Sequence, residues 1–371
     1  MKVLYLSEWY PHRYDAMPGL FVRKHAAAAV RQGADVCVLY LHPDKQIKGE
    51  EITEQTTAGI REICVYYGGS YLKALQKGYK TLRERWGMPD IVQLNVLTKN
   101  GLLPLYLNLR YGIPYIIVEH WSGYLPENNS FRGGLHGRLM KLIAQRAKCI
   151  LPVSEALENA MKNCGIRCAH WSRIHNVVDD FFFEERTTEG KQEKFQFLHV
   201  SCFDERSKNT QGILRAVDLL QKERTDFEIH FVGTGPDFES TVRLSDQLGL
   251  TGKIAFFEGE KTPQEVHEAM LNSQCFVLFS RYETAGVVLA ECLASGLPVI
   301  GSRAGAIPEV VSKQNGVLVE SENTDQLATA MSRMIDHAGE FSKADIRAMA
   351  GRYSEEAVGK MLLDTYTKYA H

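Results

Sequence analysis

The sequence lacks several motifs that would assign it to common functional classes. It has no Asp-x-Asp, a pattern that holds divalent cations, and no Gly-x-Gly-x-x-Gly, the fingerprint of nicotinamide-dinucleotide sites. No apolar run approaches the length of about 18 residues that spans a membrane. The apolar run after Met1 is too short for a signal peptide. We therefore expect neither a membrane span nor a dehydrogenase.

Cysteines are few and are not paired in sequence. The eight cysteines include no Cys-x-x-Cys, so we expect reduced side chains in a cytoplasmic protein. Cys164, Cys168 and His170 match no established zinc spacing, and we expect no metal. The net charge of −2 gives no global attraction for nucleic acid.

Two series of alternating strands and helices follow each other along the 371 residues. In the first series we expect strands at 2–7, 35–41, 63–67, 91–94, 115–119 and 149–152, and helices at 20–31, 70–86, 99–111, 134–148 and from 154. In the second we expect strands at 197–201, 229–232, 254–257, 276–278 and 299–300. This alternation predicts an α/β protein with parallel sheets covered by helices on both faces.

A polar and charged stretch at 181–194 separates the two series and predicts the domain linker. We expect an N-terminal Rossmann-like domain at 1–180 and a C-terminal one at 181–353. The segment 354–371 contains an amphipathic helix whose apolar face carries Val358, Met361, Leu362, Thr365 and Tyr369.

A strand–turn–helix–strand pattern organises the second series. The apolar run 275–279 predicts a strand, and the following helix should begin near Gly286 and end near Gly296. A helix N-terminus carries unpaired N–H groups and a partial positive charge. Val287 and Val288 would present such amides, so this helix tip is a candidate anion site.

Two glutamates flank this helix tip. Glu283 precedes the helix, and Glu291 lies about 7 Å along it from Gly286. Carboxylates repel phosphate but accept hydrogen bonds from sugar hydroxyls. The pattern therefore suits a diphosphate between two hydroxylated rings, as in a nucleotide-sugar. The alternative is a glutamate that favours the helix dipole and a second one on a solvated face.

The pattern Glu-x7-Glu, followed by the motifs at 294–300 and 304–311, resembles the retaining glycosyltransferases of family 4, which have the GT-B fold. The order of elements extends the resemblance over nearly the whole chain. It implies two Rossmann-like domains that face a cleft, with the C-terminal helix crossing back to the N-terminal domain. Thr284 and Ala285 depart from the family's usual Gly-Phe. Ala306 replaces the second glycine of Gly-Gly-x-Pro-Glu.

Two residues in the first half acquire roles from the resemblance. It implies that His120, at the end of a predicted strand, donates a hydrogen bond to the transferred sugar; a structural histidine is the alternative. It also implies that the amide of Gly19, before the first helix, reaches the diphosphate, whereas a plain turn glycine is equally compatible with the sequence.

The resemblance also assigns charged residues in the second half. Lys208 would bind the diphosphate. The arginine that the family carries nearby is missing, and Arg206 either replaces it or is a surface charge. Glu291 would hold the nucleotide ribose and Glu283 the donor sugar.

The resemblance implies a metal-independent glycosyltransferase of the hexosyltransferase type, EC 2.4, with no cofactor beyond its nucleoside-diphosphate-sugar co-substrate. The acceptor would be a saccharide or a lipid-linked hydroxyl in surface polysaccharide or glycolipid synthesis. A nucleotide-sugar epimerase and a non-catalytic sugar-nucleotide-binding subunit are the alternatives. The sugar, the base and the linkage do not follow from the sequence.

Basic residues with leucines and aromatics mark two helical stretches, 71–86 and 132–148. Such helices are solvated faces or dock on an anionic membrane surface. The second reading would place a cytoplasmic protein peripherally at the inner face of the membrane.

Overall fold

The structure is a computed structural model that describes residues 1–131, 133–185 and 193–370. It divides into unit 1, Met1–Val177 with Tyr353–His371, and unit 2, Val178–Arg352. The sequence placed these boundaries at 180/181 and 353/354. Part of the expected linker at 181–194 lies outside the described residues.

Unit 1 contains a seven-stranded sheet with the order β3-β4-β2-β1-β5-β6-β7. All neighbouring strands are parallel except β3 and β4. The strands are β1 (Lys2–Ser7), β2 (Asp35–Pro43), β3 (Glu50–Thr57), β4 (Ile60–Tyr67), β5 (Ile91–Asn95), β6 (Tyr115–Glu119) and β7 (Cys149–Pro152).

The antiparallel hairpin of β3 and β4 was not predicted. Its two-residue turn, Ala58 and Gly59, has φ angles of 49° and 78°, as a type I′ turn requires. β3 is the edge strand and most of its residues are exposed. Its charged, polar sequence protects an open edge from aggregation and hides the apolar alternation that signals a strand.

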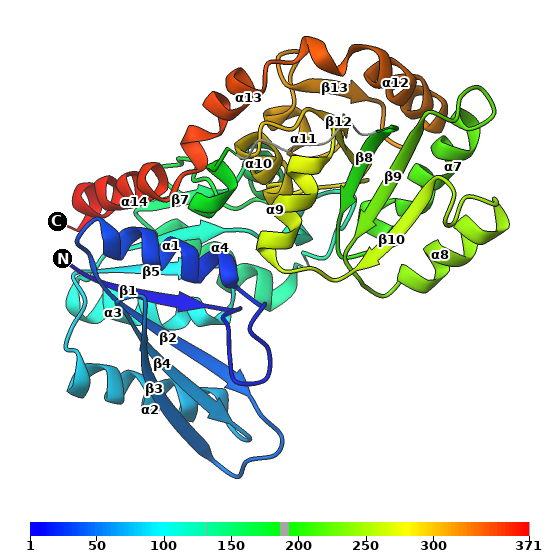
Figure 1. Ribbon diagram of the computed structural model, residues 1–371. Helices are drawn as coiled ribbons and strands as arrows, with labels where there is room; N and C mark the ends of the chain where they lie inside the picture. The colour runs from blue at the N-terminus through cyan, green and yellow to red at the C-terminus, as the bar shows by residue number, and fades with distance from the viewer. Residues whose placement is uncertain (132, 186–192, 371) are drawn as a thin grey trace. The chain divides into compact units, whose positions relative to one another are not determined.

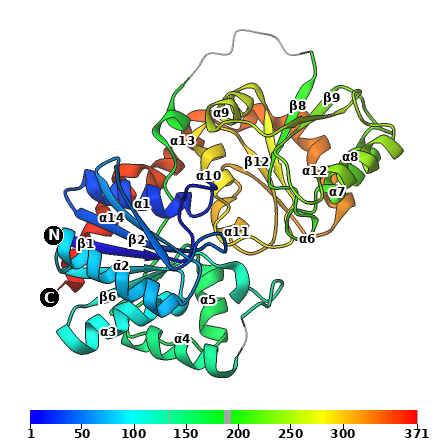
Figure 2. The same cartoon turned by 90° about the horizontal axis from the view of Figure 1, so that it is seen from below.

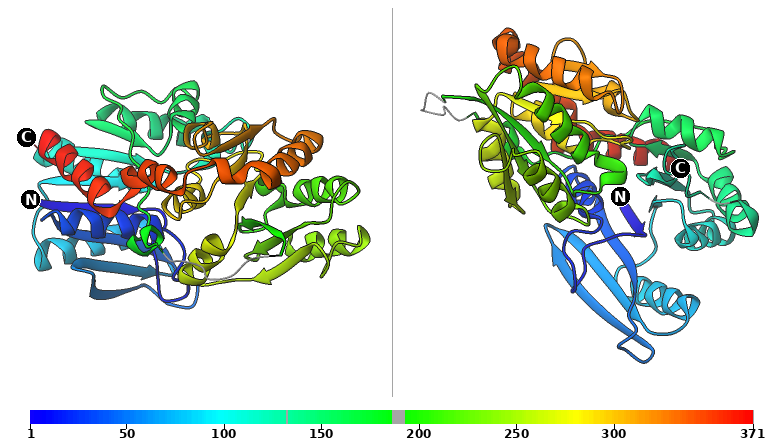
Figure 3. Two further views of the ribbon diagram at one scale, coloured as in Figure 1. Left: turned by 45° about the horizontal axis from the view of Figure 1, so that its top comes forward. Right: turned by 90° about the vertical axis from the view of Figure 1, so that its right-hand side faces the viewer.

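Helices cover both faces of this sheet. α14 lies beside α1 (Figures 1 and 3), and α2, α3 and α4 are seen together in Figure 2. The helices are α1 (Leu20–Arg31), α2 (Tyr71–Arg85), η1 (Lys99–Gly101), α3 (Leu102–Tyr111), η2 (Ser122–Tyr124), α4 (Gly134–Arg146), α5 (Glu155–Asn163) and α14 (Glu355–Tyr369).

The C-terminal helix α14 packs closely on α1 within unit 1. A Cβ at Gly359 would lie 2.5 Å from the carbonyl oxygen of Ala28, so the contact requires glycine. The Tyr366 hydroxyl is buried and donates to Oε1 of Gln93 at 2.6 Å, while it also bonds to the Tyr5 hydroxyl. The predicted apolar face was partly wrong, because Tyr366 is buried whereas Tyr369 is only half-buried.

Unit 2 contains a six-stranded parallel sheet with the order β10-β9-β8-β11-β12-β13. The short edge strand β13 was not predicted. The strands are β8 (Phe195–Val200), β9 (Phe227–Val232), β10 (Ala255–Gly259), β11 (Cys275–Leu278), β12 (Val299–Ser302) and β13 (Gly316–Val319). The helices are η3 (Asp180–Phe183), α6 (Glu205–Lys208), α7 (Thr210–Leu220), α8 (Phe238–Gln247), α9 (Pro263–Asn272), α10 (Val287–Ala294), α11 (Ile307–Val310), α12 (Thr324–His337), η4 (Ala338–Glu340) and α13 (Lys343–Ala350). The short helix η5 (Gly351–Tyr353) contains the unit boundary after Arg352.

Both sheets are doubly wound from a central strand. In unit 2 the order runs outward from β8 in one direction and from β11 in the other; in unit 1 the corresponding neighbours are β1 and β5. At such a switch point the loops after the two strands diverge, and the crevice outside their carboxyl ends is where ligands bind in open α/β sheets. The prediction of two parallel-sheet α/β domains is confirmed, apart from the added hairpin.

Candidate functional site

The switch point of unit 2 brings Lys208 and Glu283 together. Lys208 follows β8 and Glu283 follows β11, and Nζ of Lys208 forms an ion pair with Oε1 of Glu283. Their side chains are 19% and 10% exposed, respectively. Burial lowers the pKa of Lys208, but the charge and hydrogen bond of Glu283 outweigh burial and raise that pKa above its ordinary value. The sequence assigned both residues to the site without predicting that they pair.

The loop that carries Glu283 is held by short contacts. The Ser280 hydroxyl donates to Oε1 of Glu283 at 3.1 Å. The backbone amide of Ala306 donates to the carbonyl oxygen of Glu283 at 3.0 Å. Gly305 has a φ of 50°, and a Cβ there would lie 2.2 Å from that same carbonyl oxygen. The glycine is therefore needed for this approach, while Ala306 has an ordinary helical φ of −80° and tolerates its side chain.

The loop that carries Lys208 is folded against the loop after β9. A Cβ at Gly235 would lie 1.6 Å from the carbonyl oxygen of Cys202, and one at Gly233 would lie 2.0 Å from that of Ser201. Phe203 and Asn209 adopt positive φ angles of 42° and 51°, which are uncommon for residues other than glycine. Asparagine adopts this conformation readily, whereas the bulky Phe203 does so only under strain. The two glycines and Phe203 thus mark a tightly constrained backbone around Lys208.

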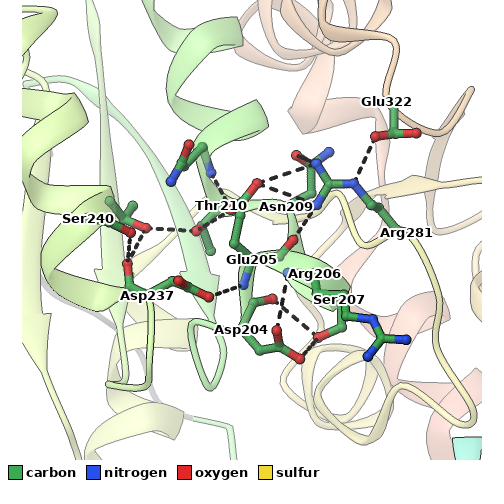
Figure 4. Close-up of polar contacts among 12 residues, drawn as sticks. Asp204, Glu205, Arg206, Ser207, Asn209, Thr210, Asp237, Ser240, Arg281 and Glu322 are labelled. Carbon is green, nitrogen blue, oxygen red and sulfur yellow. Dashed lines mark hydrogen bonds and ion pairs between the residues drawn. The ribbon is translucent and has the colours of Figure 1, made fainter. Parts of the chain in front are cut away.

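Arg281 links the two loops and was missed by the sequence analysis. Its guanidinium donates to the carbonyl oxygen of Glu205 and, through Nη2, to Oδ1 of Asn209 at 2.9 Å (Figure 4). Its Nε donates to Oε1 of Glu322 at 2.8 Å, and its backbone amide donates to the carbonyl oxygen of Ser207 at 2.8 Å. Arg281 therefore sets the position of Lys208 relative to Glu283, and only its place two residues before Glu283 hinted at this role.

Helix α10 begins where the sequence placed it. Gly286 is the residue before the first helical turn, with φ 60° and ψ 57°, and no acidic side chain lies in that turn. Val287 and Val288 are half-buried in the first turn, and Glu291 is half-buried one turn later. Gly296 follows the helix with a φ of 73°, as a C-terminal glycine does. The helix tip keeps its positive end, which suits an anion.

Arg206 lies on the exposed side of the short helix α6, two residues before Lys208. Its amide donates to Oδ1 of Asp204 at 3.1 Å, which caps this helix. The proposed replacement of the family's arginine by Arg206 stays a prediction.

His120 is the candidate site residue in unit 1. It follows β6, is 9% exposed, and its ring packs on that of Phe21 with centroids 4.1 Å apart. Burial, followed by the proximity of His25, lowers the pKa of His120 well below its ordinary value, so the ring is neutral. Among the described residues, no group bonds to its buried Nε2. A buried polar atom without a partner points to a ligand or an ordered water.

Gly19 is the residue before α1 and has a φ of 66°. It lies two residues before Phe21 in the sequence. A Cβ at this position would lie 2.1 Å from the carbonyl oxygen of Trp9, so the packing of the loop on itself already requires glycine. This explains Gly19 as a turn glycine, and its role toward a diphosphate stays a prediction.

The described residues offer neither a metal centre nor a membrane-spanning helix. Within 1–131, 133–185 and 193–370, no three His, Cys, Asp or Glu side chains come together in an arrangement that could hold a metal ion. In the same residues, no helix has the length and apolarity needed to cross a bilayer. The cysteines are free thiols.

The fold matches solved structures over almost its full length. Sucrose-phosphate synthase from Thermosynechococcus elongatus superposes with a TM-score of 0.78 at 17% identity, covering 99% of each chain. HepE from Anabaena, solved in complex with UDP, gives a TM-score of 0.77 at 18% identity, covering 99% of this chain and 100% of that one. These likenesses show that the fold is GT-B, as the resemblance implied.

The sequence matches two family models that adjoin each other. Residues 19–180 match Glycosyltransferase Family 4, and residues 181–355 match Glycosyl transferases group 1. The chain belongs to the family 4 glycosyltransferases, which confirms the family that the sequence motifs indicated. Sulfoquinovosyl transferase SQD2 of Arabidopsis thaliana is 23% identical over 291 residues, which are 74% of this chain. The match spans 48% of that relative, about half its length.

Proposed function

We propose that the chain is a retaining glycosyltransferase that moves a sugar from a nucleoside-diphosphate-sugar to an acceptor hydroxyl without a divalent cation. The observation that carries the proposal is the Lys208–Glu283 ion pair at the switch point of unit 2. It joins a phosphate-binding cation to a carboxylate suited to sugar hydroxyls. Membership of the glycosyltransferase family supports the reaction type.

Binding of the donor would exchange partners within this ion pair. The diphosphate would take the ammonium of Lys208 and the amides of Val287 and Val288. Glu283 would then accept hydrogen bonds from the sugar hydroxyls, and Glu291 from the ribose. Fixed positive charge of this kind stabilises the charge that develops on a leaving diphosphate, which is the role a cation would otherwise take.

The chemistry needs no further reactant. The oxygen of the acceptor hydroxyl bonds to the anomeric carbon while the bond from that carbon to the diphosphate oxygen breaks. The hydroxyl proton passes to the departing diphosphate, and attack on the face that the diphosphate leaves retains the anomeric configuration. In unit 1, the neutral ring of His120 would bind a hydroxyl of the transferred sugar through its unpartnered Nε2.

A nucleotide-sugar donor is supported by the structurally similar HepE from Anabaena, which has been solved with UDP and with UDP-glucose. The test is a thermal-shift screen of UDP-, GDP- and ADP-sugars, each with and without EDTA. We expect stabilisation by one nucleotide class, unchanged by EDTA. Glu291→Ala should abolish this stabilisation, whereas Glu239→Gln, at a side chain 88% exposed, should keep it.

Turnover separates the alternatives. We expect nucleoside diphosphate to be released only when an acceptor is present. The His120→Ala variant should lose this release while it largely keeps donor binding. Formation of a new nucleotide-sugar without such release would show an epimerase. Donor binding without turnover across a broad acceptor panel would show a non-catalytic subunit.

We further propose that the α2–α3–α4 face of unit 1 contacts an anionic membrane surface. Leu72, Leu109 and Leu135 are 63%, 62% and 84% exposed on these helices. A groove of about 720 Å³ between α2 and α3 is lined in part by Lys80 and Arg83. Exposed leucines beside cations fit a lipid headgroup layer. Arg132, part of the expected basic stretch, lies outside the described residues.

The test is sedimentation with vesicles. We expect binding to phosphatidylglycerol vesicles, weakening in high salt, and no binding to phosphatidylcholine vesicles. Leu72→Glu combined with Leu135→Glu should abolish binding, whereas Met17→Glu, at an exposed residue of the loop after β1, should not. Equal sedimentation of all three proteins would contradict the proposal.

A further inference from the structure

A buried carboxylate, Glu119, lies immediately before His120. It is the last residue of β6 and is 0% exposed. Its Oε1 accepts hydrogen bonds from the backbone amides of His120 and Trp121, each at 2.9 Å. Its Oε2 accepts from the amide of Leu97, also at 2.9 Å. One side chain therefore joins the loop after β6 to the loop after β5.

The loop after β5 is strained where it meets Glu119. Val96 has a φ of 67°, a left-handed conformation that is a genuine outlier for a β-branched residue. Its amide donates to the carbonyl oxygen of Val118 at 2.8 Å, and the next amide, that of Leu97, donates to Glu119. Such a conformation persists only where surrounding contacts enforce it.

We propose that Glu119 is a positioning residue, whose ionised carboxylate holds His120 and the strained β5 loop in place by accepting their backbone amides. The inference rests on the proposed function, in which His120 binds the transferred sugar. No side chain other than a carboxylate offers two acceptor oxygens and no donor at this position. Protonation converts one oxygen into a donor that faces N–H groups, which loosens the anchor.

Among the residues that the structure describes, no cation pairs with the Glu119 carboxylate. The ring of His120 is neutral, and His25 behind it is also neutral because burial lowers the pKa of His25 to about 4. Tyr124, from η2, stays protonated because burial and then the charge of Glu119 raise its pKa. Burial raises the pKa of Glu119 to about 7, and its three amide hydrogen bonds only partly oppose this.

The direction of the pH dependence follows. As pH rises through about 7, Glu119 ionises and the amides of Leu97, His120 and Trp121 gain their acceptor. The folded state binds the Glu119 proton more tightly than the unfolded chain, whose pKa is near 4.5. Stability contributed by this group is therefore present below pH 4.5 and falls as pH rises to about 7. Ordering of the site is thus obtained at a cost in stability.

The test is a pH titration followed by NMR with selective ¹⁵N labelling of leucine, histidine and tryptophan. We expect the amide signals of Leu97, His120 and Trp121 to titrate together with a midpoint near pH 7. Glu119→Gln should remove this titration, and Glu119→Asp, which keeps the charge but shortens the reach, should weaken it. Glu8→Gln is the matched control, because the Glu8 carboxylate bonds to Thr98 and Asn100 instead.

Two outcomes would overturn the inference: the three amides do not share a midpoint in the unchanged protein, or the shared titration persists in Glu119→Gln. In transfer assays, Glu119→Gln should lower kcat at least tenfold and flatten its rise near pH 7, with donor-induced thermal stabilisation unchanged. The amide titration does not depend on turnover. An unchanged protein that shows the titration but transfers no sugar would therefore count against the proposed function, not against the anchor.

Discussion

Lys208 and Glu283, 75 residues apart in sequence, form an ion pair at the ends of the neighbouring strands β8 and β11. The pair follows from topology, since these strands flank the switch point of the doubly wound sheet. The raised pKa of Lys208 means that the stability from its charge is fully present below its ordinary pKa of 10.5 and is lost only above it.

Removal of Lys208 should weaken both the fold and the site. Lys208→Met leaves Glu283 partly buried without its cation, which we expect to destabilise unit 2 by roughly 2–4 kcal/mol. It also removes one charged hydrogen bond to the diphosphate, worth about 1.5–3 kcal/mol, or roughly 10- to 150-fold in donor Kd. Urea unfolding and calorimetric titration with the donor check the two effects.

The double variant Lys208→Met/Glu283→Gln separates these effects. It should recover part of the stability while donor binding stays weak, because no carboxylate is then left unpaired. Full recovery of donor binding in the double variant would contradict the roles given to the two residues.

Gly305→Ala should disrupt the loop that carries Glu283. The new Cβ would lie 2.2 Å from the carbonyl oxygen of Glu283 at a φ of 50°, so we expect a loss of about 3 kcal/mol or more. Gly252 has a φ of 71°, but a Cβ there would meet open space, so Gly252→Ala should cost about 1 kcal/mol of stability. Gly339→Ala, with open space and no positive φ, should be near neutral. A loss no larger in Gly305→Ala than in Gly252→Ala would refute the close approach.

Acid should destabilise unit 2 through His199. Nδ1 of His199 contacts the carbonyl oxygen of Val277 and Nε2 contacts the Ser201 hydroxyl, each at 2.8 Å. Burial lowers its pKa to about 4 although the bond to Val277 opposes this. The unfolded chain takes up the proton near pH 6.5, so stability present above 6.5 falls as pH drops toward 4.

The expected slope is about 1.4 kcal/mol per pH unit for this one group. His199→Gln should reduce the acid slope of unfolding by that amount, measured as urea midpoints between pH 4.5 and 7. His337→Gln, at an exposed side chain, is the control and should leave the slope unchanged. An identical slope in both variants would show that His199 is not the group involved.

Tyr366→Phe should loosen the C-terminal helix from unit 1. The variant removes the hydroxyl that donates to Gln93 and bonds to Tyr5, all within the core. A buried polar group left unsatisfied costs about 1–3 kcal/mol. Hydrogen exchange of the α14 amides should increase relative to Tyr369→Phe, which removes the hydroxyl of a half-buried ring. Equal exchange in both would argue against this anchor.

Strong periodicity made most of the fold predictable. The expected helix at 20–31 and strands at 115–119 and 149–152 coincide with α1, β6 and β7. β3 escaped because an edge strand need not bury both faces, and its polar sequence carries no continuous apolar run. β13, Gly-Val-Leu-Val, is apolar throughout but only four residues long, too short to stand out as a strand. Tyr366 was missed because a buried hydroxyl network does not show in an apolar pattern.

The candidate site was predictable in composition but not in its internal contacts. The helix tip at Gly286 followed from capping signals, whereas the ion pair of Lys208 with Glu283 depends on which strands are neighbours. Arg281 was missed because its partners are backbone and side-chain groups distant in sequence. In the sequence, Glu119 stands out only as the end of an apolar run. A glutamate at the end of a strand that is buried throughout indicates a carboxylate with a structural or functional role.

The most direct measurement is a crystal structure of the protein with the nucleoside diphosphate that gives the largest thermal shift. We predict that its phosphate oxygens lie about 3 Å from the amide nitrogens of Val287 or Val288 and from Nζ of Lys208. Glu291 should accept hydrogen bonds from the ribose. A diphosphate bound elsewhere, with the Lys208–Glu283 ion pair intact, would contradict the account.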